Sequence, residues 1–362
     1  MENQQPTIKD IAKMAGVSIA TVDRVLHNRG KVSKKNLDLI SAAIETLSYK
    51  PNQIARALSS RKSNIKIGLV LPQVESDFWG EIIEGVQAAQ AHLSPFGVEL
   101  ITEFSYSYDL DEQLKSINQV LKMNVNGLIM TPLYDGSSDI VDRCIPKEVP
   151  YATVIDDMPG SRRLFHIGPD DFAIGNLAAR LTELYCRPRG NVVILSPNNS
   201  LIETQQRISG FVSKVKQEQL ALNILQIIPI PGKTEKCMYQ NIYITALECI
   251  KNGHNLDAFY VTNGLTQWCA DAVVESGLVG KVKVIGHEYT SKLPQYLQSG
   301  AISAVIYQKP AMQFYKAINL LYEYIIGDQR SLNDNIITEC NIIIKENISF
   351  VHNGGNSQYG YC

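Results

Sequence analysis

The feature that most constrains the fold is a regular alternation of apolar runs and amphipathic helical segments from about residue 65 to residue 287. Runs such as "IKIGLVLP" at 65–72 and "NVVILSP" at 191–197 are almost continuously Val, Ile and Leu. Such runs are typical of strands buried on both faces, and a helix between successive strands lets them pair in parallel. The pattern therefore predicts parallel sheets covered by helices on both sides.

The alternation falls into two series of similar length, which predicts two doubly wound α/β lobes. In the first series we expect strands at 65–72, 98–104, 125–133 and 149–156 and helices at 77–97, 111–124 and 138–148. In the second we expect strands at 163–168, 191–197, 223–230, 257–263 and 281–287 and helices at 172–190, 204–217, 236–253 and 264–277. Ligands bind such sheets at the carboxyl ends of the strands, so functional side chains are expected in the strand-to-helix loops.

The charge of the chain is divided unevenly along its length. The net charge is only −2, but residues 1–62 hold 11 Lys and Arg against 5 Asp and Glu, while residues 63–362 hold 23 against 31. A basic head on an acidic body is expected when only the head binds a polyanion such as nucleic acid.

Several classes of protein are disfavoured by the sequence. The chain has no run of 18 apolar residues and no basic segment followed by an apolar core near its start, so we expect no membrane span and a cytoplasmic location. Its seven cysteines are scattered singly, which suits free thiols. "PIPGKT" at 229–234 has Ile227 where a phosphate-binding loop needs glycine, and "HEYTS" has Ser291 where a metalloprotease helix needs histidine. We therefore predict no enzyme activity, cofactor or metal.

The basic head has the pattern of a small three-helix unit. In "TIKDIAKMAGVSIATVDRVLHN", Thr7 can cap a first helix, Gly16 permits a tight turn and Ser18 can cap a second helix. This arrangement predicts a helix-turn-helix whose second helix enters the major groove of DNA. A third helix over 33–50 would complete the core with Leu37, Ile40, Ile44 and Leu47.

A family resemblance becomes specific over the same residues. "IKDIAKMAGVSIATVDRVLHNRGKVS", followed by "AAIETLSYKPNQIARAL", resembles the DNA-binding head of the LacI/GalR family of bacterial transcription regulators, nearly continuously over residues 7–58. The rest resembles that family's effector domain, which has the two-lobed fold of periplasmic sugar-binding proteins. The resemblance implies a repressor that binds a pseudo-palindromic double-stranded operator as a homodimer and responds to a small sugar or polyol.

The resemblance also implies the domain limits. Residues 1–50 would form the head, 51–63 a hinge helix and linker, 64–350 the effector-binding and dimerisation domain, and 351–362 a tail. Within the effector domain, the N-lobe would comprise about 64–165 and 309–335, and the C-lobe about 166–308 and 336–350.

The DNA contacts implied by the resemblance lie on and around the second helix. Ile19 and Ala20 would read bases, and Arg24 would face the bases, where arginine pairs best with guanine. The remaining implied contacts of the head, mostly to phosphate, are Thr7, Ser18, Thr21, Asn28, Arg29, Lys31 and Ser33. Asp23 stands where the family usually has serine; it would pair with a neighbouring basic side chain or accept a hydrogen bond from cytosine.

The segment "PNQIARAL" resembles the hinge helix of the family. Leu58 falls where the family inserts a leucine into the minor groove, with Asn52 and Ala55 earlier in the same helix. The alternative is that Leu58 only packs within a linker helix.

The effector residues implied by the resemblance follow strand ends or begin the next helix: Phe78, Trp79, Asp156, Asp157, Arg207, Asn263, Glu288 and Gln308. Carboxylates, amides and one arginine suit a polyhydroxylated neutral ligand, and only one of the two rings is expected to contact it. The carboxylates at 157 and 288 disfavour a phosphorylated ligand. Each of these groups could instead be a satisfied polar residue at a strand end. The alternative for the whole chain is a sugar-binding protein with no role in DNA regulation.

Overall fold

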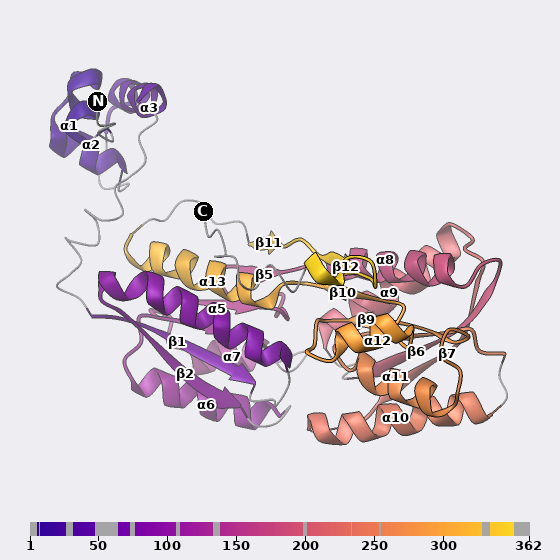
Figure 1. Cartoon of the computed structure of the whole chain (residues 1–362). Helices are drawn as coiled ribbons and strands as arrows, with labels where there is room; N and C mark the ends of the chain where they lie inside the picture. Colours follow the sequence, from indigo (N-terminus) through magenta and orange to yellow (C-terminus); the bar gives the residue numbers. More distant parts are fainter. Residues whose placement is uncertain are drawn as a thin grey trace.

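The structure is a computed structural model that describes residues 6, 8–26, 32–47, 64–72, 77–105, 109–132, 138–197, 201–232, 234–252, 255–327 and 334–350. The head is helical, and Figure 1 shows that the body consists of two lobes that lie side by side. No helix within the described ranges is long and apolar enough to cross a membrane.

The head is a helix-turn-helix followed by a third helix, as predicted. Helices α1 (Ile8–Ala15) and α2 (Ile19–Leu26) are joined at Gly16, whose φ of 65° is readily adopted by glycine, and α3 (Lys34–Thr46) packs against both. The buried core consists of Ile11, Ala12, Ala15, Val22, Ile40 and Ala43. The prediction that Leu37 belongs to this core is wrong, because its side chain is 45 % exposed. The first turn of α3 contains no buried residue, and the packed face of the helix begins at Ile40.

The first lobe is built on a six-stranded parallel sheet with the order β11-β5-β4-β3-β1-β2. Its strands are β1 (Ile65–Pro72), β2 (Val98–Ser105), β3 (Gly127–Met130), β4 (Tyr151–Val154), β5 (His166–Gly168) and β11 (Asn335–Ile337). Its helices are α5 (Asp77–Leu93), the short 3₁₀ helix η1 (Ser94–Phe96), α6 (Leu110–Lys122), α7 (Ser138–Cys144) and α13 (Pro310–Ile325). Leu69 of β1 packs towards α5 and α13 and Val70 towards α6 and α7, so both faces of the sheet are covered.

The second lobe repeats this plan with the strand order β12-β10-β9-β8-β6-β7, parallel except for β12 against β10. Its strands are β6 (Gly190–Pro197), β7 (Leu222–Ile230), β8 (Ala258–Val261), β9 (Lys283–His287), β10 (Ala304–Tyr307) and β12 (Asn341–Ile343). Its helices are α8 (Asp171–Tyr185), α9 (Ile202–Gln217), α10 (Glu235–Lys251), α11 (Thr266–Glu275) and α12 (Leu293–Ser299). The predicted pair of doubly wound lobes is confirmed.

The chain passes between the lobes three times, after β5, after β10 and after β11. We expected the strand at 163–168 to open the second series, but β5 pairs with β4 of the first sheet, and the Ile155 amide donates to the Ile167 carbonyl at 3.0 Å. The first lobe therefore extends to Gly168, and all of β11 also belongs to it. Helix α7 ends at Cys144, short of the expected 148. The next residue, Ile145, precedes Pro146, and the proline ring disfavours helical backbone geometry in the residue before it.

Candidate functional site

A buried arginine lies at the centre of the candidate site. Arg207, in the second turn of α9, is 1 % exposed. Its Nε donates to Oδ1 of Asp171 at 2.8 Å and its Nη1 to the carbonyl oxygen of Thr262 at 2.8 Å. Its Nη2 lies 3.4 Å from Oε2 of Glu203. The guanidinium thus joins α8, α9 and the carboxyl end of β8.

Two glycines allow α8 and α9 to approach closely enough for these contacts. A Cβ atom on Gly175 would lie 2.1 Å from the Arg207 carbonyl oxygen, and one on Gly210 would lie 2.1 Å from the Phe172 carbonyl oxygen. Real Cβ atoms do not tolerate such distances, so only glycine permits this backbone contact. The crossing brings Asp171, in the first turn of α8, within reach of Arg207.

Asp156 connects this group to the first lobe. It follows β4, is 4 % exposed, and its Oδ1 accepts hydrogen bonds from the amides of Asp157 at 3.1 Å and Glu203 at 3.4 Å. Burial raises the pKa of Asp156 well above its ordinary value, and the nearby Glu203 and Asp171 carboxylates raise it further. Burial likewise raises the pKa of Glu203 to about 6, although Arg207 opposes the shift.

A fourth carboxyl group lies at the end of β9. Glu288 is 5 % exposed, and its Oε1 accepts a hydrogen bond of 2.7 Å from Nε2 of Gln308, which follows β10. The backbone of Glu288 has a φ of 67°, a conformation uncommon for residues with a side chain. Burial raises the pKa of Glu288 to about 8, against the opposing effects of Arg207 and Gln308. We call Asp156, Asp171, Glu203, Arg207 and Glu288 the interlobe cluster.

Three members of this cluster and several residues at strand ends carry buried polar atoms that make no hydrogen bond within the described part of the chain. Atoms that are buried and make no hydrogen bond with the described residues include Oδ2 of Asp156, Oε2 of Glu288 and Nη2 of Arg207. The hydroxyl groups in the same condition include those of Thr131, Ser196, Thr204 and Thr262. All but two of these residues lie at or directly after the carboxyl end of a strand, and the other two lie on α9. Because buried polar groups normally have partners, these atoms mark a place where a polar ligand would satisfy them.

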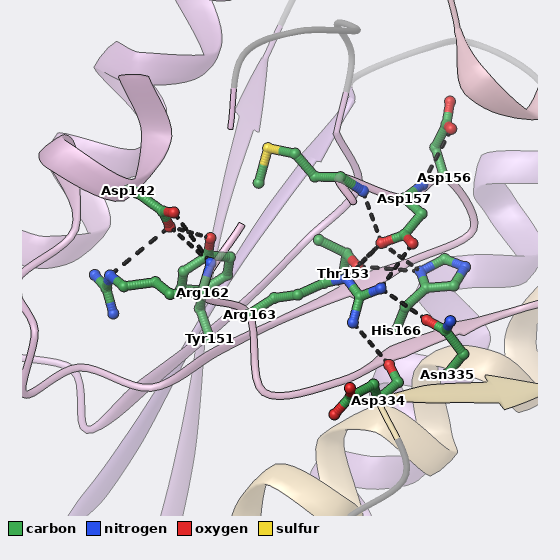
Figure 2. Close-up of polar contacts among 11 residues, drawn as sticks. Asp142, Tyr151, Thr153, Asp156, Asp157, Arg162, Arg163, His166, Asp334 and Asn335 are labelled. Carbon is green, nitrogen blue, oxygen red and sulfur yellow. Dashed lines mark hydrogen bonds and ion pairs between the residues drawn. The ribbon is translucent and has the colours of Figure 1, made fainter. Parts of the chain in front are cut away.

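Asp157 is turned away from the cluster. Its carboxylate binds Arg163 through two contacts, Nε to Oδ1 at 2.6 Å and Nη2 to Oδ2 at 2.8 Å, and it accepts from the Thr153 hydroxyl at 2.9 Å. His166 lies 3.5 Å away, and burial lowers its pKa to about 4. Figure 2 shows Asp156 pointing away from this group. The structure therefore places the two adjacent aspartates in different environments.

The other expected effector residues lie near strand or helix ends. Phe78 and Trp79, in the first turn of α5, are half-buried, pack edge to face with ring centroids 5.2 Å apart, and contact the core of the first lobe. Asn263, after β8, is half-buried and accepts at Oδ1 from the Leu265 amide at 3.1 Å. Of the eight expected residues, Asp156, Arg207, Glu288 and Gln308 make or adjoin the interlobe cluster.

Helix α2 presents an exposed surface at the other end of the chain. Ile19, Ala20 and Arg24 are exposed, and Ile19 is 50 % exposed although it is apolar. Ser18 begins α2, where its Oγ accepts from the Thr21 amide at 3.1 Å. At the start of α3, Oγ of Ser33 accepts a hydrogen bond from the Asn36 amide at 3.4 Å. The side chain of Asp23 lies outside the described residues, as do Thr7, Asn28, Arg29, Lys31, Asn52, Ala55 and Leu58.

Comparison with known proteins agrees with both parts of the chain. Residues 7–52 match the family described as bacterial regulatory proteins, lacI family, and residues 67–329 match the periplasmic binding protein domain. The chain belongs to the LacI/GalR family.

Relatives and solved structures are consistent with this membership. The HTH-type transcriptional regulator GalR of Escherichia coli strain K12 is 29 % identical over 60 % of this chain and 61 % of its own length. The sucrose operon repressor of Streptococcus mutans is 29 % identical over 58 % of this chain and 62 % of its own length. The chain thus spans about three fifths of these relatives. GanP, a glucose-galactose binding protein from Geobacillus stearothermophilus, is 25 % identical with a TM-score of 0.71, over 79 % of this chain and 99 % of GanP.

In this LacI/GalR-family chain, Asp171 and Glu203 of the interlobe cluster were not among the site residues expected from the sequence. Glu203 precedes Arg207 by four residues, a spacing that places two side chains on the same face of a helix and could have revealed it. No comparable local signal marks Asp171, which reaches Arg207 only through the crossing of α8 and α9. In the ranges that the structure describes, no three His, Cys, Asp or Glu side chains are placed to hold a metal ion.

Proposed function

We propose that this protein is a DNA-binding transcription regulator, acting as a repressor in the cytoplasm, whose operator affinity is set by a small sugar or polyol bound between its two lobes. The observation that carries the proposal is the set of buried, unsatisfied polar atoms at the strand ends of both lobes. The same chain also contains a lacI-family head, and the surface of α2 in that head is exposed.

The chemistry of these atoms favours a polyhydroxylated ligand. The hydroxyl groups of Ser196 and Thr262 can each donate or accept, whereas Arg207 can only donate and an ionised Asp156 can only accept. A ligand with several hydroxyl groups can pair with all three kinds of partner. The names of the sucrose operon repressor and of GanP refer to sugars, which supports the same ligand class. A phosphorylated ligand is disfavoured, because its phosphate would face four carboxyl groups and one arginine.

Control of DNA binding would follow from linkage between the two sites. Asp156 of the first lobe accepts from the amide of Glu203 in the second lobe, so a ligand at this junction would contact both lobes and bias their arrangement. The ligand can change operator affinity only by the difference in its affinity for two states of the protein. We propose that those states differ in the pairing of two hinge segments in a homodimer, which would bind a pseudo-palindromic operator.

The proposal is tested by selecting genomic fragments with the full-length protein and titrating the selected fragment in gel-shift assays. We expect a preference of at least about a thousandfold over random competitor and a steep loss of affinity as salt rises. A neutral sugar or polyol should shift this affinity by about 5- to 150-fold, the usual range of allosteric coupling. A protein that bound every fragment equally, with and without sugars, would contradict the regulator proposal.

Two substitutions separate base reading from groove insertion. Arg24→Ala should weaken specific binding by about 1–3 kcal/mol and relax the preference at one base position. Leu58→Ala should remove operator preference but leave salt-sensitive non-specific binding, because an intercalating side chain acts only at the bent site. Unchanged operator affinity in the Leu58→Ala variant would show that this residue only packs in the linker.

A further inference from the structure

The charges of the interlobe cluster do not balance. The cluster combines four carboxyl groups with one guanidinium, and the side chains of its members at 171, 203 and 207 are 13 %, 12 % and 1 % exposed. Burying a carboxylate without a compensating charge is costly, so a carboxyl group of the cluster that has no cation beside it favours its protonated form, and a bound cation would favour the ionised one.

The one cation of the cluster is already engaged. Arg207 gives one hydrogen bond to Asp171 and one to the Thr262 carbonyl oxygen, and its remaining nitrogen faces Glu203. Asp156 has no such partner: the hydrogen bonds it accepts come from two backbone amides, and its Oδ2 is buried without one among the described residues.

The surroundings of Asp156 are also acidic. The charged groups that act on it most strongly are the carboxylates of Glu203 and Asp171, and both raise its pKa. Glu288 differs, because Arg207 and Gln308 favour its ionised form while Glu81 and Glu203 oppose it. Of the four carboxyl groups of the cluster, Asp156 is therefore the one that has neither a cation nor a side-chain donor among the described residues.

We propose that the effector carries a protonated amine, as an amino sugar or amino polyol does, and that its ammonium group binds the free carboxylate oxygen of Asp156. This inference rests on the proposed function and narrows its ligand class. An ammonium has three donors and no acceptor, and it supplies the positive charge that a neutral hydroxyl cannot. The unsatisfied hydroxyl groups of Ser196 and Thr262 remain available for the ligand's own hydroxyl groups.

The test compares sugars that differ only in one group. Full-length protein is titrated calorimetrically at pH 7 with D-glucosamine against D-glucose, D-galactosamine against D-galactose, and D-mannosamine against D-mannose. For at least one pair we expect the amine to bind at least about tenfold more tightly, the usual gain from a hydrogen bond between charged groups. Because the pKa of Asp156 is raised, amine binding should also release protons, seen as a heat that depends on the ionisation enthalpy of the buffer.

A matched pair of variants assigns the effect to one residue. Asp156→Asn should bring the amine-to-hydroxyl affinity ratio close to one and abolish the proton release. Glu99→Gln, which removes a carboxylate that is 54 % exposed at the opposite end of the first sheet, should change neither. Proton release by the unmodified protein provides a readout that does not depend on whether Asp156→Asn folds.

The possible outcomes separate the two proposals. Neutral sugars that bind as tightly as their amine counterparts would overturn the amine inference and leave the proposed function intact. Failure of every pair to bind would overturn the sugar effector and the amine together. Operator binding, measured with the same preparation, tests the regulator proposal separately.

Discussion

Nε of Arg207 lies 2.8 Å from Oδ1 of Asp171, and this contact fastens the second turn of α9 to the first turn of α8. Burial raises the pKa of Asp171, and the guanidinium opposes that shift. Arg207 also donates to the carbonyl oxygen of Thr262, directly after β8, so the ion pair stabilises the lobe and also shapes the candidate effector site.

Removing the guanidinium should therefore be costly. We expect Arg207→Met to lower the free energy of unfolding by about 3–5 kcal/mol, because Asp171 and Glu203 would stay buried without their cation. Urea denaturation measures the change. Arg143→Met, at an exposed position near the end of α7, is the control and should change stability by less than about 0.5 kcal/mol. Similar small losses in both variants would show that the ion pair contributes little.

Stability should depend on pH through Glu288. Its pKa is raised to about 8 from 4.5, so between these values the folded protein holds a proton that the unfolded chain has released. The contribution of the protonated Glu288 to the free energy of unfolding is therefore complete below pH 4.5, and it is lost as the pH rises through 8. Thermal unfolding followed from pH 5 to pH 8.5 should show a smaller loss in Glu288→Gln than in the unmodified protein, by roughly 2–5 kcal/mol. If the stability of the two proteins changed equally with pH, the raised pKa of Glu288 would be contradicted.

Arg163 should add to the effect of burial, which is the main cause of the low pKa of His166. The guanidinium lowers the pKa of His166, which is about 4, whereas Asp157 raises it. Arg163→Gln should therefore raise the pKa of His166, as measured by the pH dependence of its ring proton resonances in NMR spectra.

The same substitution should destabilise the edge of the first sheet. Arg163 also donates to the Asp334 carbonyl oxygen and to Oδ1 of Asn335, both at 2.7 Å, and so holds β11 in place. We expect a loss of about 2–4 kcal/mol. A stable variant with an unchanged histidine titration would refute both expectations.

The crossing of α8 and α9 can be tested without altering any polar group. Gly210→Ala would place a methyl group against the Phe172 carbonyl oxygen, force the helices apart and cost about 1–3 kcal/mol. It should also weaken sugar binding, because Arg207 lies on the displaced helix. Gly80→Ala is a matched helical control with no atom within 4 Å of the new methyl group, and it should be neutral or stabilising by up to about 1 kcal/mol. Equal effects of the two changes would argue against a tight crossing.

The architecture was predictable because buried parallel strands are marked by continuous apolar runs. The strand at 163–168 was expected in the wrong lobe, because its order along the chain suggested the second series and only its pairing with β4 assigns it to the first. Leu37 was misassigned for a related reason. Helical spacing identifies an apolar face, but the size of the head core decides how much of that face is covered.

The site was only partly predictable because side-chain direction at a strand end depends on local backbone geometry. Ile155 has a φ of 72°, which turns the chain after β4, and the adjacent Asp156 and Asp157 then face different surroundings. The sequence shows two consecutive carboxylates and nothing that separates them. Asp171 depends on a helix crossing between Gly175 and Gly210, which are 35 residues apart in the chain.

The order in which the first lobe is assembled has a consequence for biosynthesis. Phe314 and Ile318 of α13 are fully buried against β1 and α5, and β11 forms the last strand of the same sheet. A ribosome must therefore release most of the polypeptide before the lobe that starts at Ile65 can close its core. The three-helix head, whose buried residues within the described ranges all precede residue 44, can fold long before then.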